Sequence, residues 1–574
     1  MMKKNLTVLG IHNFHDSGAA LVRNGEILAA INEERITNQK HASGYPLKSI
    51  EEVYNIAKID PSETDAIAVV GTADLRFPKH FQRFPNFSDS MINWSWVTSN
   101  QKGLDLLYLY HERIQKLEGF KKILSKLNIP IKEVFFVEHH LAHASAAYYL
   151  SPWESHEKVL VLTADGWGDG ISSTANIAVN GEIERIENSE TNQHNSLGGF
   201  YSSITEYLGM EYAFDAFKVM GLAPYGKPDN AIEEIKKIIN IDPDNNITFK
   251  QNLASFGLIQ KNLVKLLHKK RFDNIAAATQ VWFEKLFTSW VENIIKKTDI
   301  TKIACAGGAF LNVKANQAIL SLDCVDDAFF CPAASDEGLA VGAALMGYNE
   351  LELQNGHKPI KIPLVSNYFG SSFTNEQIKT TLTKHGLFDK AEYIEDIDSE
   401  VGELLASSKN IIGRFSGQME WGPRGLGNRS IIADPSNSDL VRRINKAIKM
   451  RDFWMPFGPS ILSSRIDDYL VNGKIAPYMI LAFETTDKRN DLIAAIHPYD
   501  FTCRPQTVDT EHNPGYEKVI QTFENKTGRG AILNTSFNLH GDAIVWDPEA
   551  ALHTFQNSDL DILAIGNYLL KKNN

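Results

Sequence analysis

The sequence has few cysteines and lacks long apolar runs. Only four of its 574 residues are cysteine, and none forms a C-x-x-C pair. This argues against a disulfide framework or a thiolate zinc site, and for a reducing compartment. No stretch approaches the roughly 18 apolar residues of a membrane helix. The first lysines are followed by His12, His15 and Asp16 rather than by the apolar core of a signal peptide. We therefore expect a cytoplasmic protein with no membrane partner.

The chain also lacks an excess of positive charge. It has 58 Lys and Arg residues against 70 Asp and Glu residues, which gives a net charge of −12. Because a nucleic-acid backbone needs a basic face, this balance argues against a nucleic-acid partner. Small anions need only local Arg and Lys residues, so they remain open as ligands. With 43% hydrophobic and 22% charged residues, the composition is typical of a globular chain.

The first half of the sequence contains an internal repeat. Residues 7–30 and 159–186 each read as a buried strand, a polar turn with Asp and Gly, a second strand, an Asn-Gly hairpin and a third strand. Asn-Gly favours the type I′ turn of a tight hairpin. The repeat predicts a duplicated α/β unit of the actin, sugar-kinase and Hsp70 type, in which such turns clasp nucleotide phosphates between two halves.

Residues 351–367 lose periodicity and carry two prolines, so we place a domain boundary there. The sequence predicts an N-terminal domain over residues 1–360, with a helical insertion at about residues 72–130, and a C-terminal α/β or α+β domain over residues 361–574. The insertion is rich in aromatic residues, which serve either its core or the cover of a substrate.

Two histidines and two aspartates form a candidate metal site. His139 and His143 are four residues apart in an alanine-rich helical stretch, so both imidazoles share one helix face. A core or capping role is the alternative. Asp165 and Asp336 each follow a predicted strand. If the fold brings the four together, they suit Fe(II), Mn(II) or Zn(II) with open positions for substrate.

A second set of residues is a candidate nucleotide site in the same domain. Asp215 and Lys218 lie among apolar neighbours, where they form either an ion pair with each other or contacts to ribose and phosphate. A strand also runs into a glycine turn and a helix, whose N-terminal amides can bind an anion. This turn and helix supply Gly307, Gly308, Asn312 and Asn316.

The C-terminal region concentrates cations among Gly, Pro, Trp and Phe, where a solvated charge is unexpected. Guanidinium groups with Ser and Asn donors form a pocket for a phosphate and a small carbonyl group. The candidate residues are Arg414, Arg424, Lys449, Arg451, Arg504, Ser536 and Asn538.

These motifs together resemble one family along nearly the whole chain. They comprise His15-Asp16, the segment from Glu33 to His41, the His139/His143 pair, the run from Lys218 to Gly226, the glycine turn, residues 422–427 and residues 533–538. The sequence is similar to the O-carbamoyltransferases of nodulation-factor, tobramycin and cephamycin biosynthesis. The N-terminal domain resembles tRNA threonylcarbamoyl-transfer proteins, and the C-terminal domain resembles carbamoyl-adenylate-forming modules of hydrogenase maturation.

The resemblance implies a two-step reaction in natural-product or sugar modification. Carbamoyl phosphate and ATP, with Mg²⁺, give carbamoyl-adenylate in the C-terminal domain. A hydroxyl acceptor then takes the carbamoyl group at the N-terminal metal, for which Fe(II) is preferred. The implied metal ligands are the four named above. The implied phosphate and carbamoyl contacts are Arg424, Lys449, Arg504 and Ser536, with Asn538 nearby. Catalytic roles are expected for His15 as base, with Asp16 and Lys218.

One departure from the family and three alternative functions remain. Met455 replaces the arginine that many relatives carry before Pro-Phe, so Arg451 or Arg429 is expected to compensate.

A sugar-kinase-like phosphotransferase would use the same cleft and release ADP. A nucleotide-switched binding module would need a peptide-binding domain, which the cation-rich C-terminal region does not resemble. A tRNA-modifying role is disfavoured by the net charge. A homodimer is the default expectation for the assembly.

Overall fold

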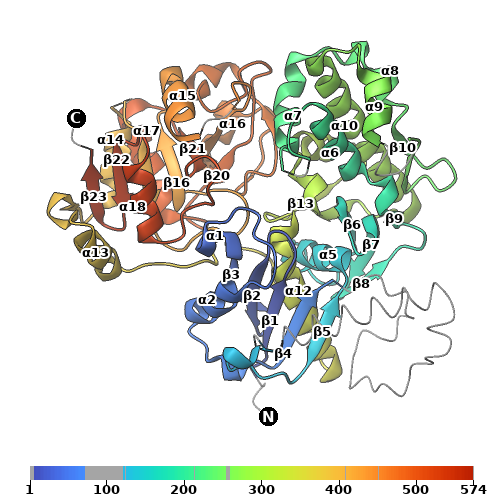
Figure 1. Cartoon of the computed structure of the whole chain (residues 1–574), viewed down its shortest axis with the longest axis horizontal. Helices are drawn as coiled ribbons and strands as arrows, with labels where there is room; N and C mark the ends of the chain where they lie inside the picture. Colours follow the sequence, from blue (N-terminus) through green and yellow to red (C-terminus); the bar gives the residue numbers. More distant parts are fainter. Residues whose placement is uncertain are drawn as a thin grey trace.

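The computed structural model describes residues 5–71, 121–122, 124–212, 214–253, 259–407, 409–449 and 452–572. Arg451 and most of the predicted insertion lie outside the described residues. Two sheets of the same topology make up the N-terminal part, and a third sheet makes up the C-terminal part (Figure 1). No described helix is both long enough and apolar enough to span a membrane.

The first sheet has the strand order β3-β2-β1-β4-β5, and the second has the order β8-β7-β6-β12-β13. In each, the first three strands in sequence are antiparallel and the last two are parallel to the first. The strands are β1 (Thr7–His12), β2 (Gly18–Arg23), β3 (Glu26–Asn32), β4 (Ala66–Val70), β5 (Val134–Val137), β6 (Val159–Gly168), β7 (Ile171–Val179), β8 (Glu182–Arg185), β12 (Lys302–Ala306) and β13 (Asp327–Phe330). The predicted duplication is confirmed, and with it the actin-like class of the N-terminal part.

Two helices lie between these sheets and fix the geometry of the site. They are α5 (His139–Leu150) and α12 (Leu339–Gln354). Their backbones approach so closely that a Cβ on Gly342 would lie 1.9 Å from the carbonyl oxygen of Ala142. The hydroxyl of Ser145 donates to the carbonyl of Gly342 at 2.7 Å. Because α5 starts directly after β5, and a short turn precedes α12, this packing brings the start of α5 and that turn together.

Four other helices, of which α10 is the longest, cover the outer face of the second sheet. They are α6 (Leu197–Tyr207), α7 (Ala216–Leu222), α10 (Phe272–Thr298) and α11 (Val313–Leu320). Their apolar faces form one core with the sheet, and its centre includes the fully buried Phe287 and Trp290 of α10. The spacing of these aromatic residues at positions three or four apart explains why one face of α10 is buried.

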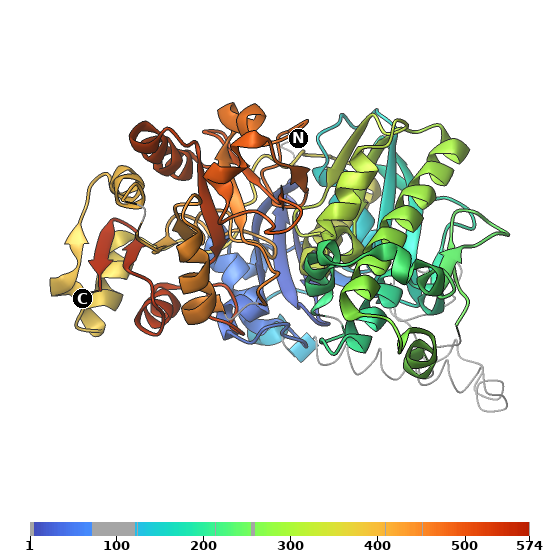
Figure 2. The same cartoon turned by 90° about the horizontal axis from the view of Figure 1, so that it is seen from above.

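The C-terminal sheet has the order β14-β23-β22-β15-β16-β21-β17-β20. Its strands are β14 (Glu392–Tyr393), β15 (Ile412–Phe415), β16 (Arg429–Ala433), β17 (Gly458–Leu462), β20 (Gln506–Val508), β21 (Ala531–Ser536), β22 (Ile562–Ile565) and β23 (Tyr568–Lys571). Helices α14 (Ile397–Leu405), α15 (Ser438–Ile444), α17 (Pro514–Thr527) and α18 (Pro548–Gln556) pack around it. Figure 2 shows the first N-terminal sheet between this part and the second sheet. The boundary at residue 360 stays a prediction.

Candidate active site

The two histidines and two aspartates of the predicted metal site lie together. Nε2 of His139 is 3.0 Å from Asp165 and 3.6 Å from Asp336. Nε2 of His143 is 3.5 Å from Asp165 and 3.4 Å from Asp336. One donor atom from each residue lies within 4.8 Å of all the others. The start of α5, the end of β6 and the turn before α12 supply them, which the sequence pattern predicted only as separate pieces.

The electrostatics of this cluster fit a bound divalent cation. Nε2 of His143 and Oδ1 of Asp336 are buried and have no hydrogen-bond partner among the described residues. Burial would lower the pKa of His139, but Asp336 and Asp165 raise it to about 9. Burial likewise opposes ionisation of Asp165, yet the hydrogen bond of His139 and the adjacent imidazole of His143 hold its pKa well below the usual range. A dication would satisfy both unpaired atoms.

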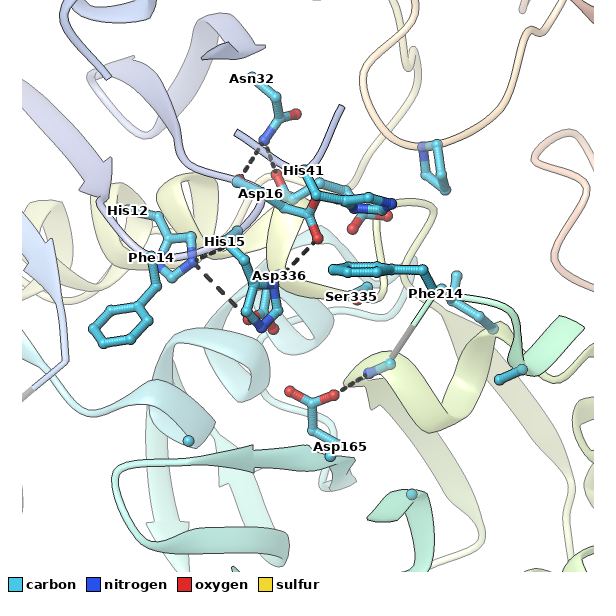
Figure 3. A pocket seen from close by; sticks show the side chains of 18 of the residues that line it. His12, Phe14, His15, Asp16, Asn32, His41, Asp165, Phe214, Ser335 and Asp336 are labelled. Atoms are coloured by element: carbon cyan, nitrogen blue, oxygen red, sulfur yellow. Dashed lines mark hydrogen bonds and ion pairs between the residues drawn. The ribbon is translucent and has the colours of Figure 1, made fainter. Parts of the chain in front are cut away.

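A second group of polar residues adjoins the cluster on the β1–β2 turn (Figure 3). His15 lies between two carboxylates, with Nε2 3.3 Å from Asp336 and Nδ1 3.3 Å from Asp16. The other oxygen of Asp16 is 2.9 Å from Nδ1 of His41. The hydrogen bond of Asp16 raises the pKa of His15 to about 9. His15 and Asp16 therefore adjoin the metal ligands, and their catalytic roles remain predictions.

The C-terminal candidates Lys449, Ser536 and Asn538 also form one cluster. The ammonium of Lys449 donates to the carbonyl of Ser536 at 2.6 Å and to the side-chain oxygen of Asn538 at 2.5 Å. The hydroxyl of Ser536, at the end of β21, donates to that same amide oxygen at 2.7 Å. Lys449 also holds the amide oxygen of Asn538 that accepts the proton of the Ser536 hydroxyl. The direction of that hydroxyl is therefore fixed in this structure.

Arg424 is the cation that faces the open space beside this cluster. Its guanidinium has no hydrogen-bond partner among the described residues, and the charge of Glu337 acts on it. Burial lowers its pKa. The loop that carries it wraps the carboxylate of Glu420, which accepts from the amides of Leu426 and Asn428 at 2.8 and 2.7 Å. A half-buried guanidinium whose donors have no partner within the described residues can bind an anion.

One cavity of about 940 Å³ is lined by members of both groups, although His143 and Lys449 are not among its lining residues. Its lining combines metal-site residues from the N-terminal part with anion-site residues from the C-terminal part. Its walls include His15, His139, Asp165, Asp336, Arg424, Ser536 and Asn538. The two candidate sites therefore open into the same space, which no sequence pattern indicated.

Some of the predicted nucleotide residues line the cavity and others do not. Gly308 and Asn312 line the cavity, and the amide of Gly308 donates to Asp165 at 3.1 Å. Gly307 has a φ of 105°, and a Cβ there would lie 2.2 Å from the carbonyl of Ala164, so it permits close approach of two strand ends. Asn316 and Asp215 do not line the cavity.

Asp215 and Lys218 form the ion pair that was the alternative interpretation, with Nζ 3.0 Å from the carboxylate. Their segment instead contacts the C-terminal part. The indole of Trp454 donates to the carbonyl of Lys218 at 3.1 Å, and His497 bonds the carbonyl of Gly221 at 2.8 Å. The structure thus shows this motif joining the two parts, while Ala216, Phe217 and Met220 beside the pair line the cavity; the ligand roles of Asp215 and Lys218 stay predictions.

Asn316 is a buried structural residue. It is fully buried and donates to the carbonyls of Phe310 and Ile480 at 2.7 and 2.9 Å. We expect Asn316→Ala to cost about 2 kcal/mol of stability through these two lost bonds. A scanning-calorimetry midpoint lowered by a few degrees, with an unchanged KM for ATP, is the predicted outcome. A raised KM at an unchanged midpoint would restore the nucleotide role.

Other predicted anion contacts lie away from the cavity. Arg414 is buried and donates to the carbonyl of Gly427 at 2.8 Å and to Asp398 at 2.7 Å, so its donors serve the fold. Arg504 does not line the cavity. A Cβ on Gly221 would lie 2.8 Å from the sulfur of Met455, which therefore packs against α7. The compensation for Met455 that we expect from Arg451 or Arg429 stays a prediction.

Comparison with known proteins agrees with this geometry. The model of the carbamoyltransferase N-terminus matches residues 7–345, and that of the C-terminus matches residues 403–572. The chain belongs to the carbamoyltransferase family. It is 33% identical over 98% of its length to an uncharacterised protein of Methanocaldococcus jannaschii, of which it covers 99%. It is 30% identical over 97% of its length to nodulation protein NolNO of Sinorhizobium fredii, of which it covers 79%.

Family membership confirms the expectation of an O-carbamoyltransferase; the donor, the nucleotide and the acceptor remain predictions. Among solved structures, HypF of T. kodakarensis covers 63% of this chain at 12% identity, with 49% of that protein covered and a TM-score of 0.35. That likeness is too low to carry an argument about function.

Several cavity residues were not identified from the sequence. Glu337 is held at a pKa of about 8 by burial and by the charge of Asp16, and its Oε1 has no hydrogen-bond partner among the described residues. Asn32, Arg35 and His41 also line the cavity. In the sequence, the segment from Glu33 to His41 stood out only as a motif that carries the family resemblance.

Proposed function

We propose that the protein forms carbamoyl-adenylate from carbamoyl phosphate and ATP at the Arg424, Lys449 and Ser536 group. It then transfers the carbamoyl group to a hydroxyl of a small-molecule acceptor beside His139, His143, Asp165 and Asp336. The single observation that carries the proposal is the shared cavity, because a reactive intermediate made at one group reaches the other without crossing bulk water.

The first step has a definite chemical balance. Carbamoyl phosphate takes up water to give carbamate and phosphate, and a carbamate oxygen attacks the α-phosphorus of ATP to release pyrophosphate. Negative charge is present on every reactant. The free donors of Arg424 and the cluster around the ammonium of Lys449 offset it in a site with little water. The hydroxyl of Ser536 lines the cavity and would have to turn away from the amide oxygen of Asn538 to donate to a phosphate or carbonyl oxygen.

The second step needs an acceptor hydroxyl and a group that removes its proton. His15 lies between Asp16 and Asp336, which orient its ring toward the metal cluster. Two nitrogen and two oxygen ligands suit Fe(II), with Mn(II) or Zn(II) as alternatives. A metal held there would supply a Lewis acid for the carbamoyl carbonyl or the adenylate phosphate. Mg²⁺ accompanies ATP as co-substrate.

The cavity wall supports an acceptor with an apolar face. Phe14 and Trp167 lie on the turns of the two repeated hairpins, and 56% and 52% of their surfaces are exposed. Large aromatic side chains left exposed in a cleft favour flat or ring-shaped ligands. A sugar or another ring-containing natural product with a free hydroxyl fits this description.

The nucleotide products test this proposal without knowledge of the acceptor. We expect the protein, ATP, Mg²⁺ and carbamoyl phosphate to yield pyrophosphate, phosphate and an adenylate by ³¹P NMR, with no pyrophosphate when carbamoyl phosphate is omitted. Formation of ADP together with a phosphorylated sugar would contradict the proposal and favour the phosphotransferase alternative.

A further inference from the structure

A short segment that follows the first hairpin contacts the cavity wall on both its metal side and its anion side. It consists of Asn32, helix α1 (Glu33–Thr37) and residues 38–41, and lies where the first sheet meets the C-terminal part (Figure 1). On the metal side, the amide of Asn32 donates to the carbonyls of Asp16 and Glu337 at 3.0 and 3.3 Å. Asn32 therefore ties the β1–β2 turn to the turn that carries Asp336 (Figure 3).

On the anion side, two side chains of the same segment hold C-terminal loops. Arg35 is buried, pairs with Glu34 at 2.6 Å, and donates to the carbonyl of Gly422 at 3.0 Å, two residues before Arg424. The side-chain oxygen of Asn38 accepts from the amide of Ala543 at 3.0 Å, in the loop that follows Asn538. The segment thus holds the loops next to both groups of the anion site.

The Arg424 loop also packs directly on the metal-site turn. Gly422 has a φ of 99°, and a Cβ there would lie 3.3 Å from Cβ of Ala333, three residues before Asp336. Because so little space separates the two loops, the hydrogen bond from Arg35 to Gly422 fixes the position of the Arg424 loop relative to the metal ligands.

We infer that Asn32, Arg35 and Asn38 are positioning residues that hold the anion site in a fixed position relative to the metal site. The intermediate then stays enclosed between the two sites until an acceptor arrives. This inference rests on the proposed function. None of the three side chains needs to touch substrate, since all act through backbone groups of neighbouring loops. Loss of these contacts leaves the metal site and the anion site each intact but lets water enter between the loops that carry them.

The test measures pyrophosphate release by rapid quench, with ATP and carbamoyl phosphate but without acceptor. The wild type is expected to show a burst near one equivalent, because the enclosed adenylate blocks further turnover, and then a slow steady state. Two variants remove one contact each. Arg35→Lys keeps the charge beside Glu34 but loses the planar fork. Asn38→Gly keeps the left-handed backbone, φ 54°, and removes the side chain whose oxygen accepts from Ala543.

Both variants are expected to keep the burst and to raise the steady-state rate about tenfold, the effect of one lost charge-assisted or buried hydrogen bond. A matched control is Lys314→Met, which breaks the 2.8 Å ion pair with Asp500 elsewhere between the two parts. It should leave the steady state unchanged. The inference is overturned, and the proposed function is not, if the wild type shows the burst but the steady-state rate of pyrophosphate release is unchanged in both variants. The same holds if the control variant raises that rate equally. A wild type that releases no pyrophosphate overturns the proposed function itself.

Discussion

His139→Asn is expected to lower the affinity of the protein for its divalent metal more than about 100-fold, since even the partners of metal ligands change affinity by 10 to 100-fold. His139 contributes Nε2 at the centre of the cluster, 3.0 Å from Asp165. Metal per chain after gel filtration, measured by elemental analysis, should fall from near one to near zero. Pyrophosphate formation should persist, because Arg424 and Lys449 are untouched.

The neighbouring histidine provides the matched control. His140 is equally buried on the same helix, but its ring bonds Thr163 at 2.9 Å and the carbonyl of Ile171 at 3.0 Å. His140→Asn should lower the thermal midpoint and keep the metal. Equal metal contents in wild type and His139→Asn, or loss of metal in both variants, would contradict the ligand assignment.

Arg424→Ala is expected to lower carbamoyl-dependent pyrophosphate formation about 100-fold. Its guanidinium has no hydrogen-bond partner within the described part of the chain, so we expect two charge-assisted bonds to the substrate phosphate. Losing about 3 kcal/mol of such contacts corresponds to about two powers of ten at 1.4 kcal/mol each. For the same reason the thermal midpoint should not change.

Arg414→Lys is the control for this prediction. Arg414 spends its donors on Gly427, Asn428 and Asp398, so its replacement should lower the thermal midpoint and leave the KM for carbamoyl phosphate unchanged. If Arg424→Ala retains the wild-type rate while Arg414→Lys raises the KM, the anion site has been assigned to the wrong arginine.

The features predicted correctly from the sequence have short-range signals. The repeated hairpins are defined by alternation and Asn-Gly turns within about 30 residues, and the spacing of His139 and His143 follows from one helical turn. Asp165 and Asp336 could be joined to them only through the expected fold, because no local pattern says where two distant strand ends meet. The fold class and the four-residue cluster were therefore within reach of the sequence.

The interpretations that the structure does not support concern polar residues whose partners are distant in sequence. Asn316 bonds Ile480, 164 residues away, and Trp454 bonds Lys218, 236 residues away. An amide or a lysine between apolar neighbours must find a partner, but the sequence does not say whether that partner is a ligand or another loop. Arg35 lies in a family motif but received no role from the sequence for the same reason, since its partner Gly422 lies 387 residues away.

A crystal structure with a divalent metal and a non-hydrolysable carbamoyl-adenylate analogue tests the central claim most directly. The account predicts an anomalous metal peak among His139, His143, Asp165 and Asp336. It also predicts the phosphate of the analogue at Arg424 and Ser536, with its carbamoyl end facing the metal in the same cavity. An analogue bound in a separate pocket of the C-terminal part, walled off from the metal ligands, would contradict the account.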